Sequence, residues 1–431
     1  MNDARQPHHD RAGVNARRFV RGLGPGMIMA ATAIGTSHIV LAPVAGARFG
    51  FDLLWLVLFT HLFKYPAFEF GARYAVATET SLIAGYGRLP GPPNWGLIVF
   101  LGVTIIQGLT VLAGVMSVTA SILVVTVGGL SYTLWLLVLG LFTMAMHRTG
   151  RYPALKRGAM AMLALLALGT VVAFVATPPS PGDLARMFVP SVPAGSTLLV
   201  ASILGLMPTG INVAVWHSLW AVEHLKYWKE DGATSRTMLR TSQRDLAIGY
   251  GLSALVGVML LSLGAVLLRP RGLVPDGIEV ALTISRIYTE LLGAWMFPVF
   301  MVAAFAAMFS TVYSVMDGFP RAFSTLLRTL LPRSEILHRE SNPSYWAFMV
   351  LIFAFSLVTN TLLPNPVLVV TLVGVISLLI APVLYGLNYY CVTRLIEDEA
   401  LRPGGPLRAW ALAGMAFMTF AAGFYAYTRF W

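Results

Sequence analysis

The chain of 431 residues has little charge and almost no cysteine. Only 11% of its residues are charged and 57% are hydrophobic, whereas roughly a quarter of the residues in a soluble domain carry charge. This composition excludes an ordinary soluble globular protein. The one cysteine, Cys391, excludes a disulfide within the chain and a metal site built from cysteines. No phosphate-binding glycine loop, nucleophile elbow or His-x-x-x-His motif occurs, so the sequence indicates neither an enzyme nor a resident cofactor.

Long apolar runs dominate what the sequence does contain. Eleven of them are long enough to cross a bilayer of about 30 Å as helices that rise about 1.5 Å per residue. They cover 24–44, 52–73, 95–127, 130–146, 158–177, 197–222, 244–268, 291–316, 344–361, 366–391 and 407–429. The sequence therefore predicts an all-α integral membrane protein with about 11 transmembrane helices.

The basic residues are unevenly distributed between the connections. With the N-terminus placed inside, 23 of the 30 Lys and Arg residues fall on the inner side and 6 on the outer side. Because Lys and Arg accumulate in cytoplasmic loops, we expect residues 1–23 to form a cytoplasmic basic tail and the C-terminus to lie outside. This orientation, rather than a nucleic-acid partner, explains the net charge of +11. The compact length favours a bacterial inner membrane.

Two of the apolar runs are interrupted at matching places. The first break is Gly35-Thr36-Ser37-His38, and the second is Met207-Pro208-Thr209-Gly210. Glycine and proline weaken helical hydrogen bonding, and paired broken helices point to the central binding site of a transporter. Five spans per half is an odd number. We therefore expect 24–177 and 197–391 to be inverted five-helix repeats of the LeuT-like type, with 407–431 as an additional C-terminal helix.

Several short patches of sequence share their pattern with one known family. They are Gly24-Pro25-Gly26, residues 45–55, Met207-Pro208, Ser310-Thr311 and residues 316–319. In these patches the chain resembles the natural resistance-associated macrophage protein (Nramp) family of metal-ion transporters. The resemblance implies a secondary-active transporter that moves a divalent metal cation by alternating access, with proton coupling as a further implication.

The residues at the family's metal site are only partly retained. The resemblance places the family's Asp and Asn ligands at Gly35 and His38, and its soft methionine ligand at Met207. Leu204 stands where the family contributes a backbone carbonyl, and Thr209 stands where it has a histidine tied to proton movement. The resemblance therefore implies a metal site whose side-chain ligands are His38 and Met207.

The residue chemistry leaves two classes of cargo open. No carboxylate is present at the first break, whereas one nitrogen from His38 and one sulfur from Met207 suit a softer ion such as copper, zinc or iron. A half-helix that opens with small polar residues presents free N–H groups, so the alternative is a small polar or anionic organic solute. Either cargo would be bound by residues of the two breaks, which also include Gly35, Thr36, Ser37, Thr209 and Gly210, together with Leu204 just before the second break.

Two polar residues lie inside otherwise apolar spans. Lys64 lies well within the second span, where an unpaired charge is costly. The favoured interpretation is that its stem reaches toward the inner interface, and the functional alternative is a fixed ammonium that replaces a coupling cation or attracts an anionic solute. Gln107 is the only side-chain amide of the third span, which lacks the acidic residues that the family uses for proton flow. A membrane sensor would carry a soluble signalling region, which the short tails do not provide. The sequence therefore favours a transporter, with no partner subunit implied.

Overall fold

The protein is described by a computed structural model that covers residues 34–149, 152–230, 232–339 and 341–430. Helices make up nearly all of its regular structure, and these ranges contain no β-strand. The all-α prediction is confirmed. The predicted tail 1–23 and the part of the first span before residue 34 lie outside the described residues.

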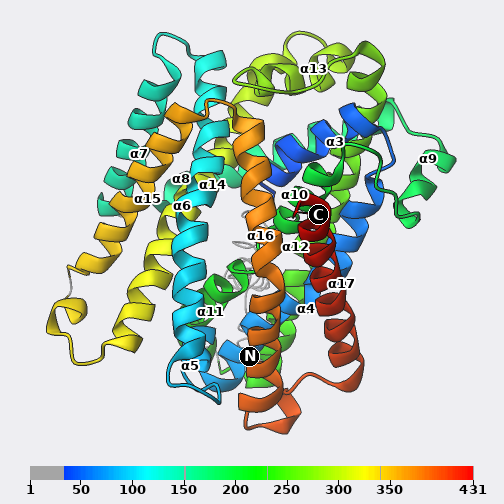
Figure 1. Cartoon of the computed structure of the whole chain (residues 1–431). Coiled ribbons are helices and arrows are strands. Elements are labelled where there is room, and N and C mark those ends of the chain that lie inside the picture. The colour runs from blue at the N-terminus through cyan, green and yellow to red at the C-terminus, as the bar shows by residue number, and fades with distance from the viewer. Residues whose placement is uncertain (1–33, 150–151, 231, 340, 431) are drawn as a thin grey trace, which may run out of the picture.

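Long helices form a bundle, and shorter ones lie both at its two ends and within it (Figure 1). The long helices are α4 (Leu54–Thr78), α6 (Trp95–Thr126), α7 (Tyr132–Thr149), α8 (Tyr152–Ala176), α11 (Val213–Glu230), α12 (Ser235–Leu263), α14 (Met296–Leu330), α15 (Pro343–Leu362), α16 (Pro366–Tyr390) and α17 (Gly405–Phe430). The shorter ones are the π-helical turn Ser37–Leu41, α3 (Ala42–Phe49), α5 (Leu82–Tyr86), α9 (Pro181–Ala185), α10 (Thr197–Leu206) and α13 (Val280–Leu292).

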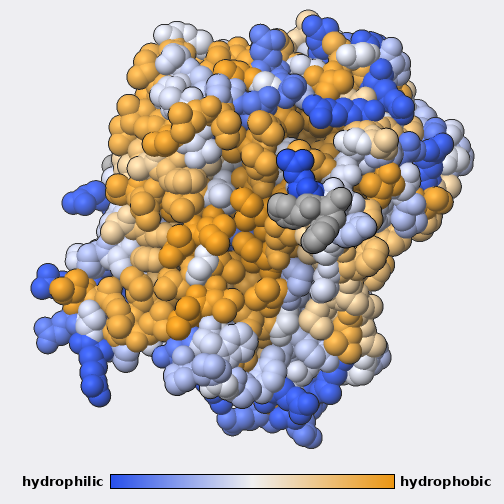
Figure 2. Space-filling model, viewed as in Figure 1, coloured by the Kyte–Doolittle hydropathy of each residue, from blue (hydrophilic) through white to orange (hydrophobic). Residues whose placement is uncertain are grey.

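The outer surface of the bundle is apolar around its middle. Figure 2 shows a broad hydrophobic band between hydrophilic patches at the two ends of the molecule. Large apolar side chains are exposed on this surface, including Leu141, Val358 and Phe420. Within the described ranges, six helices are long and apolar enough to cross a membrane, and Ala164–Ala176 and Thr197–Leu206 are shorter apolar helices. Such a band is what a bilayer covers.

The eighth predicted span, 291–316, has the wrong boundaries. The helix α14 begins later and continues to Leu330, and the preceding connection contains the helix α13. The predicted span ended at residue 316, so Asp317 was expected to mark its end. In the structure Asp317 lies inside α14 and forms an ion pair at 2.9 Å with Arg321, one turn further along. Because the two opposite charges compensate each other, the helix does not have to end at Asp317.

Helix α10 approaches α16 closely, which positions the second break. A Cβ atom placed on Gly205 would lie 1.8 Å from the carbonyl oxygen of Gly374. Only glycine can occupy this crossing without moving the backbone, and small residues serve the same purpose at other helix contacts in membranes. The end of α10 is therefore fixed against a long, continuous helix.

Helix α4 contains Pro66, which lacks the N–H that would bond to the carbonyl of Leu62. The indole of Trp410 in α17 donates a hydrogen bond of 2.8 Å to that carbonyl. The hydroxyl of Tyr385 in α16 donates to the neighbouring carbonyl of Phe63 at 2.9 Å. These bonds satisfy backbone groups that have no water to bond to inside a membrane.

Candidate functional site

The second predicted break is a gap between two helices. Helix α10 ends at Leu206 and α11 begins at Val213, and residues 207–212 between them are not helical. The expected interruption of this span is confirmed. It leaves backbone carbonyl and N–H groups available at the centre of the bundle, where the sequence is otherwise apolar.

The described part of the first predicted break is irregular only at its start, since a helical turn begins at Ser37, and it lies directly against this gap. The carbonyl of Gly35 accepts hydrogen bonds from the N–H groups of His38 and Ile39, at 3.1 and 3.0 Å, which begins the helical turns that lead into α3. The hydroxyl of Ser37 donates a bond of 3.3 Å to the carbonyl of Pro208. Segments far apart in the sequence are thus joined by a direct hydrogen bond.

A small cavity of about 40 Å³ lies where the two segments meet. Five of the residues predicted to bind cargo line it, namely Gly35, Thr36, Ser37, Thr209 and Gly210. A water molecule needs roughly 10–15 Å³ of such space, so the cavity has room for a few waters or for one small ion with some of its hydration.

Three further polar residues line the cavity: Asn212, Thr311 and Ser377. Thr311 belongs to a patch that carried the family resemblance, and Asn212 follows the second break by only two residues. These positions could have been proposed from the sequence. Ser377 lies in an apolar stretch of α16, and no local signal marks it. The Oγ atom of Ser377 is buried and has no hydrogen-bond partner among the described residues, so it is available to a ligand.

His38 does not line the cavity, although it follows Ser37 directly. Successive residues of a helix point about 100° apart, so the side chain after a cavity-facing residue points elsewhere. The His38 ring is fully buried, and its Nε2 lies 2.9 Å from the hydroxyl of Ser253 in α12. The same hydroxyl lies 2.8 Å from Nε2 of His61 in α4. His38 therefore takes part in a buried polar contact between α4 and α12.

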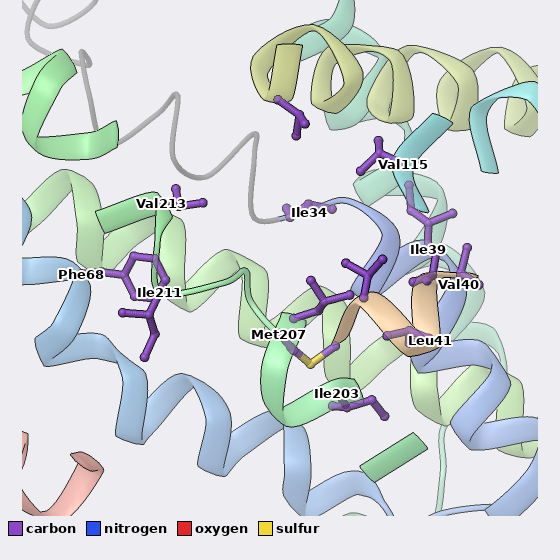
Figure 3. Packing of buried hydrophobic residues seen from close by; sticks show 14 of the residues in the cluster. Ile34, Ile39, Val40, Leu41, Phe68, Val115, Ile203, Met207, Ile211 and Val213 are labelled. Carbon is purple, nitrogen blue, oxygen red and sulfur yellow. The ribbon is translucent and has the colours of Figure 1, made fainter. Parts of the chain in front are cut away.

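Met207 and Leu204 also lie away from the cavity lining. Figure 3 shows the sulfur of Met207 among apolar side chains, near Ile203 and Leu41, and Met207 is fully buried in the hydrophobic core. Leu204 lines a separate apolar crevice that also contains Trp55. The expected pairing of His38 nitrogen with Met207 sulfur around one ion is thus absent from this arrangement. Nor do the described residues bring three His, Cys, Asp or Glu side chains together as a metal site.

The two polar residues singled out within spans both lie beside the second break. A Cβ atom on Gly210 would be 3.5 Å from Oε1 of Gln107, and that buried oxygen has no hydrogen-bond partner in the described part of the chain. Lys64 is fully buried, and its ammonium donates to the carbonyls of Gly205 at 2.8 Å and Met207 at 2.9 Å. It also lies 3.3 Å from the carbonyl of Thr209.

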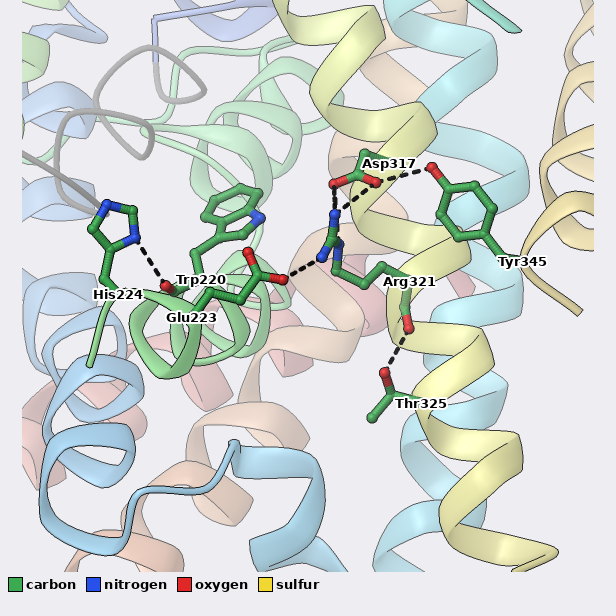
Figure 4. Close-up of polar contacts among 7 residues, drawn as sticks. All are labelled: Trp220, Glu223, His224, Asp317, Arg321, Thr325 and Tyr345. Atoms are coloured by element: carbon green, nitrogen blue, oxygen red, sulfur yellow. Dashed lines mark hydrogen bonds and ion pairs between the residues drawn. The ribbon is translucent and has the colours of Figure 1, made fainter. Parts of the chain in front are cut away.

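Larger polar cavities lie beyond the central one on two sides. One of about 440 Å³ is lined by Trp220, Asp317 and Tyr345 among others. Figure 4 shows how it is bounded: Arg321 binds Asp317 in its own helix and Glu223 in α11, and Tyr345 donates to Asp317 at 2.9 Å. The other cavity, of about 220 Å³, contains Arg48 and Asp276 together with Asn365.

Aromatic side chains lie between the central cavity and the larger of these two. Trp216 lines the central cavity and contacts Phe319 edge-on, with ring centroids 4.6 Å apart. Trp216 also lies 6.2 Å from the ring of Trp220, which lines the 440 Å³ cavity. These rings therefore separate the two cavities in this conformation.

A family profile described as "Natural resistance-associated macrophage protein-like" matches residues 26–426. The chain belongs to this family. Among curated relatives, the Nramp chain is 27% identical over 332 residues to an uncharacterized protein of Pasteurella multocida, covering 75% of this chain and 73% of the relative. It is 28% identical over 258 residues to "Divalent metal cation transporter MntH" of Chromohalobacter salexigens, covering 58% of this chain and 57% of that one. For the MntH protein of Bacillus subtilis the identity is 24% over 277 residues, with 60% of each chain covered.

Solved structures show the fold of this Nramp chain. A crystal structure of the Eremococcus coleocola manganese transporter aligns with a TM-score of 0.69 at 11% identity, covering 98% of this chain and 88% of the other. MhsT in complex with L-phenylalanine aligns with a TM-score of 0.62 at 13% identity, covering 92% and 98%. Mhp1, a nucleobase-cation-symport-1 family transporter, aligns with a TM-score of 0.56 at 13% identity, covering 94% and 93%. The LeuT-like fold is therefore confirmed.

The lining of this Nramp cavity mixes polar and apolar side chains and, within the described ranges, is uncharged. Thr36, Ser37, Thr209, Thr311 and Ser377 offer hydroxyl groups, and the lining contains no acidic side chain within the described ranges. Hydroxyl, amide and carbonyl oxygens are the ligands that hard cations prefer, although such cations usually also take a carboxylate. The arrangement can hold a small, partly hydrated cation, and it leaves the cation's charge only partly compensated.

Proposed function

We propose that this Nramp protein is a secondary-active transporter that carries a divalent metal cation across a membrane. The observation that carries the proposal is the meeting of the first described helical turns with the non-helical residues 207–212, joined from Ser37 to Pro208, around a cavity of about 40 Å³. The relatives named as divalent metal cation transporters support the choice of cargo.

The size of the cavity favours a metal ion over an organic solute. Sites for organic ligands usually enclose about 300–1,000 Å³, far more than the roughly 40 Å³ present between the two breaks. An organic substrate would require the surrounding helices to separate, whereas a small ion fits into the cavity without any movement of these helices. The alternative of a polar or anionic organic solute is therefore not favoured.

The ligands that we propose are oxygen atoms rather than the nitrogen and sulfur expected from the sequence. Thr36, Thr311 and Asn212 line the cavity, and His38 and Met207 point away from it. Oxygen ligands favour a hard ion of the manganese or magnesium kind over copper or zinc. Because no carboxylate lines the described site, the ion keeps part of its hydration shell and binds weakly.

We further propose how the protein is oriented in the membrane and how its transport cycle proceeds. The 440 Å³ cavity, close to the basic connections, is the cytoplasmic vestibule, and the 220 Å³ cavity is the outer one. The protein then lies in a bacterial inner membrane with its N-terminus inside. The two halves 24–177 and 197–391 act as inverted repeats that open these vestibules in turn. Proton coupling, which the family resemblance implied, is part of the proposal.

Uptake by purified protein in proteoliposomes tests the proposed cargo. A metal-sensitive dye inside the vesicles reports entry of Mn²⁺, Fe²⁺ or Zn²⁺, and a parallel panel measures radiolabelled small carboxylic acids. We expect saturable Mn²⁺ uptake that exceeds uptake of Zn²⁺. Saturable uptake of an acid with no flux of any divalent ion would overturn the proposal. An inward proton gradient should raise the initial rate of Mn²⁺ uptake if the cation and protons move together.

A pair of adjacent hydroxyls provides a matched test of the site. Thr311 lines the cavity, whereas its neighbour Ser310 does not, and both donate to the carbonyl of Ala307 in their own helix. We expect Thr311→Val to lower kcat/KM for Mn²⁺ by about 3- to 10-fold, equivalent to about 1 kcal/mol for one polar contact, and Ser310→Ala to change it little. Equal effects from both substitutions would contradict the assignment of Thr311 to the site.

A further inference from the structure

The ammonium of Lys64 is held by backbone carbonyls from the end of α10 and from the residues that follow it. The acceptors are Gly205, Met207 and Thr209, at 2.8, 2.9 and 3.3 Å. An ammonium has three N–H donors, so the number of acceptors matches the charged form of the side chain. The side chain is fully buried, and it is absent from the ion pairs found among the described residues.

The compensation for this buried charge comes from the backbone. The last carbonyls of a helix have no partner within the helix and carry the negative end of its dipole. Lys64 lies at that end of α10, where a positive charge is favoured. The nearest acidic residue of α4 towards its C-terminal end, Glu69, is taken by Arg73 at 2.6 Å. Neutral oxygens that converge on one buried positive charge form the kind of cage that binds a monovalent cation.

In transporters with broken helices, unwound carbonyls and the C-terminal ends of half-helices coordinate the coupling cation. We infer that Lys64 is a tethered cation that permanently fills such a carbonyl site in this protein. The carbonyls of Gly205, Met207 and Thr209 are then unavailable to a free ion. Because the site is already filled, the transport cycle requires neither Na⁺ nor K⁺. The same contacts hold α4 against the end of α10. The inference does not depend on which cargo the central cavity carries.

The inference makes a specific prediction about what replaces a missing ammonium. In Lys64→Ala the three carbonyls would be left without a donor but with space between them. A small cation that enters this space stabilises the folded state in proportion to its occupancy, by mass action. We therefore expect the thermal midpoint Tm of Lys64→Ala to be several degrees below that of the wild type. Added Na⁺ or methylammonium should restore part of the loss in a saturable manner.

The matched control is Thr60→Ala, one turn earlier in α4. Thr60 is also fully buried, and among the described residues its hydroxyl bonds only to carbonyls of its own helix, Leu56 and Val57. Its substitution should lower Tm without creating any response to Na⁺ or methylammonium. Lys64→Gln, which keeps amide donors without a charge, should show a smaller response than Lys64→Ala.

The experiment measures Tm of the purified full chain in detergent, with NaCl, KCl or methylammonium chloride exchanged for choline chloride at constant ionic strength. The wild type should show the same Tm, and the same cargo uptake, in Na⁺ and in choline. A saturable Na⁺ dependence of the wild type would overturn the inference, even if the variants fail to fold. So would a Lys64→Ala protein whose Tm responds to these cations no more than that of Thr60→Ala.

Discussion

The hydroxyl of Ser37 donates a hydrogen bond to the carbonyl of Pro208, a residue 171 positions further along the chain. The bond joins the start of the first described helical turns to the gap between α10 and α11. Both ends of it line the central cavity. A change of distance between the two breaks during transport must therefore lengthen or break this contact, and the contact favours the conformation seen here.

Removal of this bond should weaken that conformation. We expect Ser37→Ala to change kcat/KM for metal uptake by about 3- to 10-fold, since one hydrogen bond contributes about 0.5–1.5 kcal/mol. The control is Ser121→Ala, because the buried hydroxyl of Ser121 bonds within its own helix, to Val118. Initial rates in proteoliposomes provide the measurement. Similar rates for the Ser37 variant and the wild type would show that the bond does not matter to the cycle.

The ion pairs around Arg321 should keep the 440 Å³ cavity narrow. Glu223 of α11 and Asp317 of α14 both bind Arg321, so loss of the Glu223 charge releases α11 from α14. We expect Glu223→Gln to speed the labelling of a cysteine introduced as Ser314→Cys, which lines that cavity, by a membrane-impermeant maleimide. The native Cys391 is buried and gives a low background.

The control for this experiment is Glu79→Gln. Glu79 pairs with Lys229 of α11 at 2.6 Å, but both side chains are about half exposed and the pair joins α11 to α4 instead. This pair neither joins α11 to α14 nor lines the 440 Å³ cavity, so its loss should leave labelling unchanged. If the two glutamate variants label at the same rate, the pair between α11 and α14 is not a closing contact.

His38 should affect stability more than metal selectivity. Its ring contacts the hydroxyls of Ser37 and Ser253 but does not itself line the cavity, and Ser253 also contacts His61. We expect His38→Ala to lower the free energy of unfolding by about 2–4 kcal/mol, through a lost buried contact and the space left behind. The ratio of Mn²⁺ to Zn²⁺ uptake should stay that of the wild type. A changed ratio in His38→Ala would contradict this prediction and indicate that His38 is a metal ligand.

A double-substitution cycle distinguishes this polar contact from general damage. Ser253→Ala removes the hydroxyl that lies between the two histidine rings. If the contact acts as a unit, the combined effect of His38→Ala and Ser253→Ala on unfolding should be smaller than the sum of the single effects. Strict additivity would show that His38 stabilises the fold by other means.

The bond from Trp410 to the carbonyl of Leu62 should stabilise α4 at Pro66, which leaves that carbonyl without a helical donor. We expect Trp410→Phe to destabilise the protein by about 1–3 kcal/mol, because it leaves that carbonyl without a donor. Phenylalanine keeps the stacking on Tyr65, whose ring lies 5.2 Å away. Trp295→Phe is the control, since its side chain is 65% exposed. Equal Tm values for the two variants would contradict this role.

A substitution at the close crossing of α10 and α16 should cause the largest loss of stability among the variants proposed. Gly205→Ala places a methyl group 1.8 Å from the carbonyl oxygen of Gly374, so the helices must separate. We expect a loss of about 3 kcal/mol or more, measured as a fall in Tm and in the yield of monodisperse protein. Gly251→Ala in α12 has nothing within 4 Å and should be tolerated.

The sequence by itself determined that the protein is a helical membrane protein with a broken sixth span. Hydropathy and length decide this, because an apolar run of about 20 residues has one stable form in a bilayer. The five residues Gly35, Thr36, Ser37, Thr209 and Gly210 were also predictable as cavity residues, since breaks expose backbone where cargo binds. The predicted end of the eighth span, just before Asp317, was wrong. The helix continues past Asp317, whose charge is neutralised by Arg321 on the same helix.

Only the tertiary structure decided which way the polar side chains point. His38 and Met207 are adjacent to cavity residues in sequence, yet one contacts Ser253 and the other packs in the apolar core. That choice depends on rotation about the helix axis and on the neighbours from other spans. The same holds for Ser377, which no motif marks, and for Lys64, whose acceptors lie more than 140 positions away in the chain. Contacts between distant segments are set by packing, and they cannot be predicted from the local sequence.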